Sequence, residues 1–452
     1  MIALARFLGP AEFGIFAMTM FVNELAQLLV DFGIGSALVQ RKEISQRILA
    51  SCFWINIGVA SVAAVVLIGA SPFIAGYFVQ PLVQGLLIVT AVNVLVSSAT
   101  VLPQSLLVRR LAFRDITIAT TIGSLCGAGA ALAMAVSGMG VWSLAFQPLI
   151  GTTVAAGLMF KMSGWRPSFE LDLAGIRGIL KFSSHLLFSN VLSHVSRNLT
   201  SLILGPALGA AALGKITMAQ TITWLPVAQV SQTIVRATFP VFAQLQDEMD
   251  RFREGFYKAT AMIALFAFPL MTGIGVLAGD LVPVVFGPKW QEVGTLVAIV
   301  CVPALLQCVT TLAATALLGV GRSDLLLKLS VLALPVVAVP LWLAREASLQ
   351  TVVIVLAATT VATSVIALIA AMRAIGGSWR RYCGATLPPA AGSLCMGVIL
   401  WFLTETLVDA HAVARLVGLS VVGTVAYVLL AWLINREMVL EAYRLVRGLV
   451  VR

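Results

Sequence analysis

Apolar residues fall in long blocks along nearly the whole chain, separated by short segments that contain charged residues, Gly or Pro. Each block is close to the roughly 20 residues that an α-helix needs to cross the hydrocarbon core of a bilayer. The predicted spans are 14–38, 48–71, 82–106, 115–137, 140–160, 179–204, 211–239, 258–279, 293–318, 324–344, 350–373, 384–405 and 411–434. The pattern therefore predicts an all-α integral membrane protein with about thirteen transmembrane helices and no extramembrane domain.

The composition supports this fold class. Hydrophobic residues make up 60% of the 452 residues and charged residues only 11%, whereas soluble domains carry about 25% charged residues. The net charge of +10 would suggest a nucleic-acid partner in a soluble protein. Here the basic residues lie between apolar blocks, where they orient the protein and contact anionic lipid. We therefore expect membrane lipids as partners and no nucleic acid.

The basic residues also predict the orientation. Nearly all of them lie in alternate connections, beginning with the segment 39–47, and in the C-terminal tail, 435–452. The positive-inside rule places these segments in the cytoplasm. The tail itself has two open interpretations, an interfacial amphipathic helix or a disordered basic segment.

An internal repeat indicates two lobes. Residues 8–18 read LGPAEFGIFAM and residues 208–218 read LGAAALGKITM, at an offset of 200. The second copy follows a predicted span, and the corresponding span of the first copy would precede Met1, so we expect an ancestral count of fourteen helices with the first one missing. The predicted division is 1–160 for the N-terminal lobe, 161–373 for the C-terminal lobe, 374–434 for two extra helices and 435–452 for the tail.

Polar residues inside the predicted spans are the candidates for function, because a charge at mid-bilayer costs about 2.5–3.5 kcal/mol on insertion scales. The stripes of polar residues that recur on one helix face comprise Asn23, Glu24, Gln27 and Asp31; Asn93, Ser97, Thr100 and Gln104; Asn190, His194, Arg197 and Ser201; and Gln229, Gln232 and Arg236. For the neutral residues, an alternative role is to join helices by hydrogen bonds. For Glu24 and Arg197, a water-filled cavity is the better interpretation.

The signs of these charges differ between the two halves. The first half buries acidic residues and the second half basic ones. A cavity between them would present a cationic wall to an anionic head group, since the planar guanidinium of Arg makes bidentate contacts with phosphate. The carboxylates of Glu24 and Asp31 are suited to hold a coupling H⁺ or Na⁺. His194 is suited to titrate in such a cavity, although packing within the helix bundle is the more usual role of a lone His.

Motifs for catalysis are missing from the sequence, which has no Walker A loop, GxSxG, HExxH or cytoplasmic DxD. The six cysteines are scattered without a CxxC motif, so we expect neither a metal site nor a cofactor. Transport energy would then come from an ion gradient or from the gradient of the transported lipid.

Several segments resemble the polysaccharide-exporter (O-antigen and exopolysaccharide flippase) branch of the MOP superfamily. These segments are ARFLGPAEFG (5–14), VDFGIGSALVQRKE (30–43), LPQSLLVRRLAFR (102–114), WRPSFEL (165–171), SRNLTSLILGPALGAAALG (196–214), VRATFPVFAQLQDE (235–248) and FGPKW (286–290). The resemblance covers roughly the first two-thirds of the chain; the last third matches only in hydropathy.

This resemblance implies two six-helix lobes in a V around a central cavity, two extra C-terminal helices and alternating access. It also implies a polyprenyl-pyrophosphate-linked oligosaccharide as substrate. Polar sites typical of the family fall on Arg6, Asp31, Arg197 and Arg236. The chain departs from the family at two further positions, because Thr200 replaces a common Asp and Ile216 replaces a common Tyr.

The hypothesis from sequence is thus a non-enzymatic lipid-linked oligosaccharide flippase of the bacterial inner membrane, acting with other polysaccharide-assembly proteins. Its predicted cationic substrate site consists of Arg6, Arg197 and Arg236, and its predicted coupling-ion or polar cavity consists of Asn23, Glu24, Gln27, Asp31 and His194. The alternatives are a multidrug/cation antiporter of the same superfamily and a membrane enzyme of polysaccharide assembly.

Overall fold

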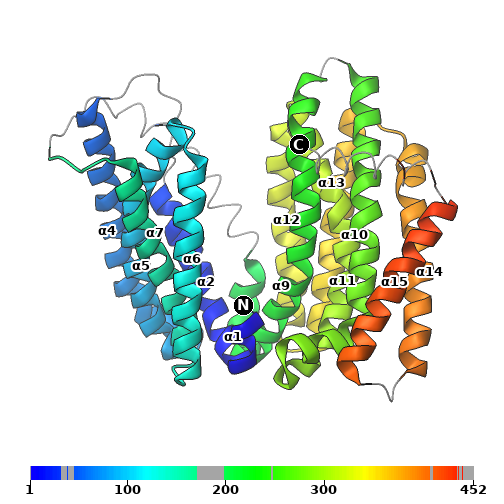
Figure 1. Cartoon of the computed structure of the whole chain (residues 1–452), viewed down its shortest axis with the longest axis horizontal. Coiled ribbons are helices and arrows are strands. Elements are labelled where there is room, and N and C mark those ends of the chain that lie inside the picture. Colours follow the sequence, from blue (N-terminus) through cyan, green and yellow to red (C-terminus); the bar gives the residue numbers. More distant parts are fainter. Residues whose placement is uncertain are drawn as a thin grey trace. The chain divides into compact units, whose positions relative to one another are not determined.

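The computed structural model describes residues 2–31, 38, 45–169, 198–245, 248–407, 411–434, 436 and 440, and in this part of the chain the secondary structure is helical, without strands (Figure 1). The helices are α1 (Ile2–Phe7), α2 (Pro10–Asp31), α4 (Gln46–Tyr77), α5 (Leu82–Arg109), α6 (Phe113–Val136), α7 (Trp142–Ser163), α9 (Leu199–Gln244), α10 (Met249–Phe286), the 3₁₀ helix η1 (Pro288–Trp290), α11 (Gln291–Gly319), α12 (Ser323–Ala344), α13 (Leu349–Ile375), α14 (Trp379–Thr406) and α15 (Ala412–Ile434).

Eleven of the helices in the described residues are long and apolar enough to cross a membrane. The prediction of a multi-pass all-α membrane protein is therefore confirmed. The predicted span 14–38 corresponds to the helix α2, and the predicted span 179–204 begins outside the described residues. The chain divides into two compact units, Met1–Gly214 and Lys215–Arg452.

In the first unit, α5 packs against α2, α4 and α7, and α6 packs along α7. The contact between α6 and α7 is a direct approach of the two backbones. A Cβ atom on Gly123 would lie 2.5 Å from the carbonyl oxygen of Gly151, and one on Gly127 would lie 2.5 Å from that of Gln147. The absence of side chains at these glycines lets the helices come this close, as at other helix contacts in membranes.

The two copies of the repeat contact each other within this unit. The helix α9 is kinked at Gly209, which has φ 77° and ψ 174°, and its continuation crosses the start of α2. A Cβ atom on Gly14 would overlap the carbonyl oxygen of Ala210, and one on Gly214 would overlap that of Pro10. Gly14 and Gly214 are equivalent in the two copies of the repeat, and so are Pro10 and Ala210, four residues earlier. The two contacts are therefore reciprocal, because each glycine meets the residue four positions before the glycine of the other copy.

In the second unit, α10 packs against α11, α14 and α15, and α13 packs against α11 and α12. Phe242 and Phe252 stack in its core with ring centroids 4.6 Å apart. The largely buried ion pair between Asp280 and Arg415 joins the end of α10 to the start of α15. The last two helices are thus fixed to the rest of this unit by both apolar packing and charge.

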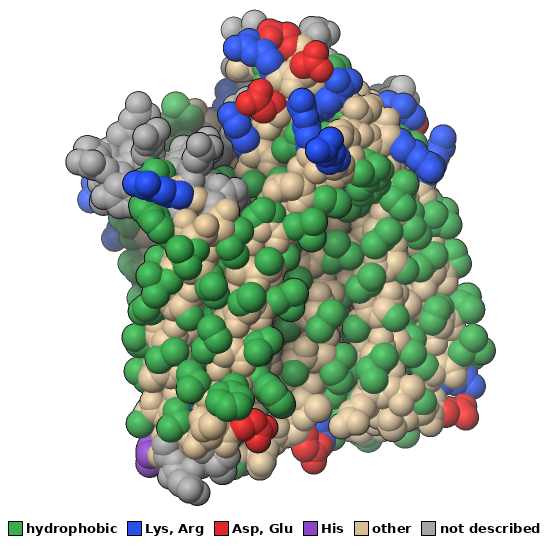
Figure 2. Space-filling view, turned by 90° about the vertical axis from the view of Figure 1, so that its right-hand side faces the viewer, with side chains coloured by type: hydrophobic (Ala, Val, Ile, Leu, Met, Phe, Trp, Pro, Cys, Tyr) green, Lys and Arg blue, Asp and Glu red, His purple; other side chains and the backbone are tan. Residues whose placement is uncertain are grey.

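The outer surface of the second unit is suited to lipid. Figure 2 shows one face on which hydrophobic side chains cover a broad middle zone, while Lys and Arg side chains gather mainly at one end. Exposed apolar residues on α14 and α15 include Val398, Trp401, Phe402, Val421 and Leu429. An exposed apolar zone of this extent would be a liability in water, but it matches the hydrocarbon core of a bilayer.

Candidate functional site

The polar stripes predicted on α2 and α5 face each other in the structure. The hydroxyl of Ser97 on α5 donates a hydrogen bond of 2.8 Å to Oε1 of Gln27 on α2. One turn away along both helices, Asn23 and Asn93 line the same small pocket. The structure therefore brings together two stripes that lie about seventy residues apart in the sequence.

This pocket lies between α2, α5 and α7 and has a volume of about 10 Å³. Its polar lining consists of Thr19, Asn23, Thr90 and Asn93, and its apolar lining of Phe16, Met20, Ala145 and Pro148. The Oδ1 atoms of Asn23 and Asn93 are both buried without a hydrogen-bond donor. Thr19 and Thr90 are not among the residues predicted from sequence, although both lie at helical spacing from the two asparagines, at i−4 and i−3.

The structure describes only some of the charged residues that were predicted as candidates. Glu24 and Arg6 are exposed, on α2 and α1 respectively. Asp31 is the last residue of α2, and Arg236 lies on α9, but the side chains of both fall outside the described part of the structure. Arg197 and His194 lie outside the described residues altogether. The roles assigned to these six residues stay predictions.

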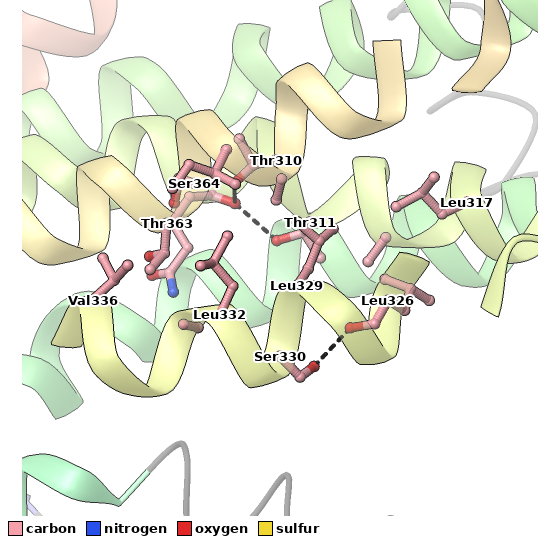
Figure 3. A pocket seen from close by; sticks show the side chains of 15 residues that line it. Thr310, Thr311, Leu317, Leu326, Leu329, Ser330, Leu332, Val336, Thr363 and Ser364 are labelled. Atoms are coloured by element: carbon pink, nitrogen blue, oxygen red, sulfur yellow. Dashed lines mark hydrogen bonds between the residues drawn. The ribbon is translucent and has the colours of Figure 1, made fainter. Parts of the chain in front are cut away.

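A larger pocket, of about 340 Å³, lies in the second unit between α11, α12 and α13 (Figure 3). Its polar side chains are Gln307, Thr310, Thr311, Ser330, Thr363 and Ser364, and none of the described residues that line it is charged. Several of its hydroxyls donate to carbonyls of their own helices, as Thr311 does to Gln307 at 2.8 Å and Ser330 to Leu326 at 3.0 Å. The pocket is therefore neutral, with hydroxyl oxygens that remain able to accept hydrogen bonds.

This pocket was not predicted from the sequence, where its only signal is the clustering of Thr and Ser near the middle of two spans. Among the described residues, no group of three or more His, Cys, Asp and Glu side chains is placed to hold a metal ion.

Thr200 and Ile216 are the two positions where the chain departs from the polysaccharide exporters that it resembles. Both are buried, with Thr200 9% exposed and Ile216 1% exposed.

Comparison with known sequences settles the family. A family model described as "Polysaccharide biosynthesis protein" matches residues 3–295, which is more than half of the chain. The chain belongs to this family. Membership in the polysaccharide biosynthesis family confirms the resemblance that the sequence motifs indicated.

Several similar proteins are named for the biosynthesis or transport of a polysaccharide. The chain is 28% identical over 337 residues to the lipopolysaccharide biosynthesis protein WzxC of Escherichia coli K12, covering 73% of this chain and 68% of that protein. It is 28% identical to the teichuronic acid biosynthesis protein TuaB of Bacillus subtilis 168, covering 66% of this chain but only 62% of TuaB. It is 24% identical to the succinoglycan biosynthesis transport protein ExoT of Rhizobium meliloti 1021, covering 96% of this chain and 89% of that protein.

Solved structures show the fold of this member of the polysaccharide biosynthesis family. The lipid II flippase MurJ, in an inward closed conformation, superimposes with a TM-score of 0.77 over 97% of each chain, at 12% identity. An inward-facing multidrug resistance MATE transporter of the MOP superfamily gives a TM-score of 0.66 over 83% of this chain and 93% of that one, at 15% identity. The MOP-type bundle expected from sequence is therefore confirmed.

Proposed function

We propose that this protein is a flippase that moves a lipid-linked oligosaccharide, carried on a polyprenyl pyrophosphate, across the bacterial inner membrane during polysaccharide biosynthesis. The observation that carries this proposal is the similarity to a succinoglycan transport protein over 96% of the chain. The fold similarity to a lipid II flippase over 97% of the chain supports it, because that protein is a flippase with the same helical arrangement.

The residue chemistry is consistent with an anionic substrate. Arg6, Arg197 and Arg236 would contact the pyrophosphate, whose charge matches the bidentate geometry of guanidinium groups. Alternating access would be driven by an ion gradient, with Glu24, Asp31 and the polar residues near them as sites for H⁺ or Na⁺. The basic connections would face the cytoplasm together with the C-terminus, where the lipid-linked precursor and other assembly proteins would meet the flippase.

Complementation tests the proposal directly. The chain would be expressed in a bacterial strain that lacks its exopolysaccharide flippase, and surface polysaccharide would be measured together with the lipid-linked precursor on the cytoplasmic side. We expect restored surface polysaccharide and loss of the accumulated precursor. The variant Arg197→Ala should lower export at least tenfold while membrane insertion stays intact, because it removes a charge-assisted contact with the pyrophosphate.

Arg345→Ala serves as the matched control. Arg345 follows the end of α12, where its guanidinium lies 3.8 Å from the ring centroid of Trp342 and beside Glu346, so its loss should leave export unchanged. Precursor that stays on the cytoplasmic side, with the unaltered chain shown in the membrane, would contradict the flippase assignment. Full export by Arg197→Ala would contradict the assigned substrate site.

A further inference from the structure

The small pocket between α2, α5 and α7 has the size and the lining of an ion site. We propose that it binds one dehydrated Na⁺ through the side-chain oxygens of Asn23, Asn93, Thr19 and Thr90. The pocket lies entirely within the first unit. Its use as the coupling site of transport rests on the proposed flippase function.

Two buried acceptors in this pocket have no donor. Asn93 is only 4% exposed, and its Oδ1 makes no hydrogen bond; the buried Oδ1 of Asn23 also makes none. Leaving a buried polar atom unpaired costs about 1–3 kcal/mol. Two such atoms on residues that line one pocket are acceptors available to a guest with positive charge or with hydrogens to donate.

Thr19 adds a further oxygen acceptor to the lining of this pocket. The hydroxyl of Thr19 donates its hydrogen to the carbonyl of Phe16 at 2.7 Å, which leaves its lone pairs for a guest. Pro148 lines the pocket from α7 and has no N–H group, so the carbonyl of Leu144, four residues earlier, lacks its usual helical donor.

Size and ligand type favour a monovalent cation over the other guests. A cavity of about 10 Å³ is at the lower limit for a water molecule, for which roughly 10–15 Å³ is needed. A dehydrated Na⁺ is smaller than water, and neutral oxygens are able to replace its hydration shell, as carbonyls do for ions in channel filters. Ca²⁺ and Mg²⁺ sites normally include carboxylates, and the described residues that line this pocket include none.

Thermal unfolding of the purified full chain in lipid nanodiscs tests the site. Tm would be measured while NaCl replaces choline chloride at constant ionic strength. Because a ligand that binds only the folded state stabilises it in proportion to the logarithm of its excess over Kd, we expect Tm to rise with Na⁺. Asn93→Leu should weaken the apparent Na⁺ affinity at least tenfold. Thr19→Val, which changes the shape of the pocket less, should weaken it by a smaller factor.

Asn56 provides a matched control. It is 2% exposed on α4, its Nδ2 donates to the carbonyl of Ser98 at 2.9 Å, and its Oδ1 is buried without a donor, but it does not line the pocket. Asn56→Leu should change Tm in choline chloride while keeping the Na⁺-dependent rise.

Two outcomes would overturn the site. One is an equal Tm in Na⁺ and choline for the unaltered chain, which is the result expected when the pocket holds only water. The other is a full Na⁺-dependent rise in both Asn93→Leu and Thr19→Val. A Na⁺-dependent rise in a chain that fails to export the lipid-linked precursor would support the site and contradict only the proposed function, so the two failures are distinguishable.

Discussion

The helices α5, α6 and α7 of the first unit and α11, α12 and α13 of the second form the same kind of three-helix group but pack differently. In each group the last helix contacts both of the others. In the first group, the backbones of α6 and α7 approach so closely that a Cβ atom on Gly123 would lie only 2.5 Å from the carbonyl oxygen of Gly151. In the second group, a pocket of about 340 Å³ separates parts of the three helices.

The difference follows from which side chains the helices carry. Three glycines, Gly123, Gly127 and Gly151, allow the close approach of α6 and α7. The helices α12 and α13 have no glycine between residues 323 and 375, and α12 carries Pro335 and Pro340 instead. Leucines such as Leu326 and Leu329 therefore hold α12 away from its neighbours, and the polar side chains of α11 and α13 face the space that remains (Figure 3).

The largest expected effect comes from closing the space that Gly123 provides. Gly123→Ala places a Cβ atom 2.5 Å from the backbone oxygen of Gly151, and a backbone atom has no rotamer by which to move away. Overpacking of this kind costs typically 1–3 kcal/mol, and we expect about 3 kcal/mol here. Thermal unfolding in detergent, followed by circular dichroism, measures the loss as a lower Tm.

Gly129 is the control on the same helix. A Cβ atom there meets nothing within 4 Å, so Gly129→Ala should stabilise the protein by about 0.5–1 kcal/mol, the usual gain of Ala over Gly inside a helix. Equal changes in Tm for Gly123→Ala and Gly129→Ala would contradict the close backbone contact between α6 and α7 as the source of the effect.

A second prediction compares the same substitution in the two groups. Ala131 on α6 is fully buried, so Ala131→Leu should cost about 2 kcal/mol by overpacking. Ala333 on α12 lines the 340 Å³ pocket, so Ala333→Leu should change stability by less than about 1 kcal/mol, because the added atoms enter existing space. Titration with a denaturing detergent checks both values, and a larger loss for Ala333→Leu than for Ala131→Leu would contradict the difference in packing.

Sequence alone predicted where the helices lie because the bilayer fixes the length of an apolar span. The span predicted at 324–344 is the helix α12, Ser323–Ala344, almost to the residue. The span predicted at 258–279 is much longer in the structure, where α10 covers Met249–Phe286. Its first turns include Arg253, whose Nε donates to the carbonyl of Ile375 at 2.7 Å. Hydropathy detects the part of a helix that lies in lipid, and tertiary contacts extend the helix beyond it.

The candidate sites were less predictable. Helical spacing identified Asn23 and Asn93 as polar positions, and the structure shows that they share a pocket. Spacing could not show that Thr19 completes that pocket, because many threonines in helices only donate a hydrogen bond to a carbonyl of their own helix. The larger pocket depends on how closely three helices approach, and this distance is set by residues such as Leu326 that look like ordinary lipid-facing positions in the sequence.

The smallest expected effect concerns the polar contacts that join each group to an earlier helix. In the first unit, the hydroxyl of Ser97 donates to Oε1 of Gln27 at 2.8 Å; in the second, the hydroxyl of Ser231 donates to the carbonyl of Cys308 at 3.3 Å. Hydrogen bonds between membrane helices average about 0.6 kcal/mol and reach about 1.7.

We expect a double-mutant cycle of Ser97→Ala and Gln27→Leu to give a coupling energy of about 1 kcal/mol, because the contact is short and joins two side chains. Ser231→Ala should cost about 0.5 kcal/mol, because its longer bond is weaker and a backbone carbonyl retains its helical partner. Reversible unfolding in mixed micelles measures both quantities. A cost for Ser231→Ala above the coupling energy of the Ser97–Gln27 pair would show that bond length does not rank these two contacts.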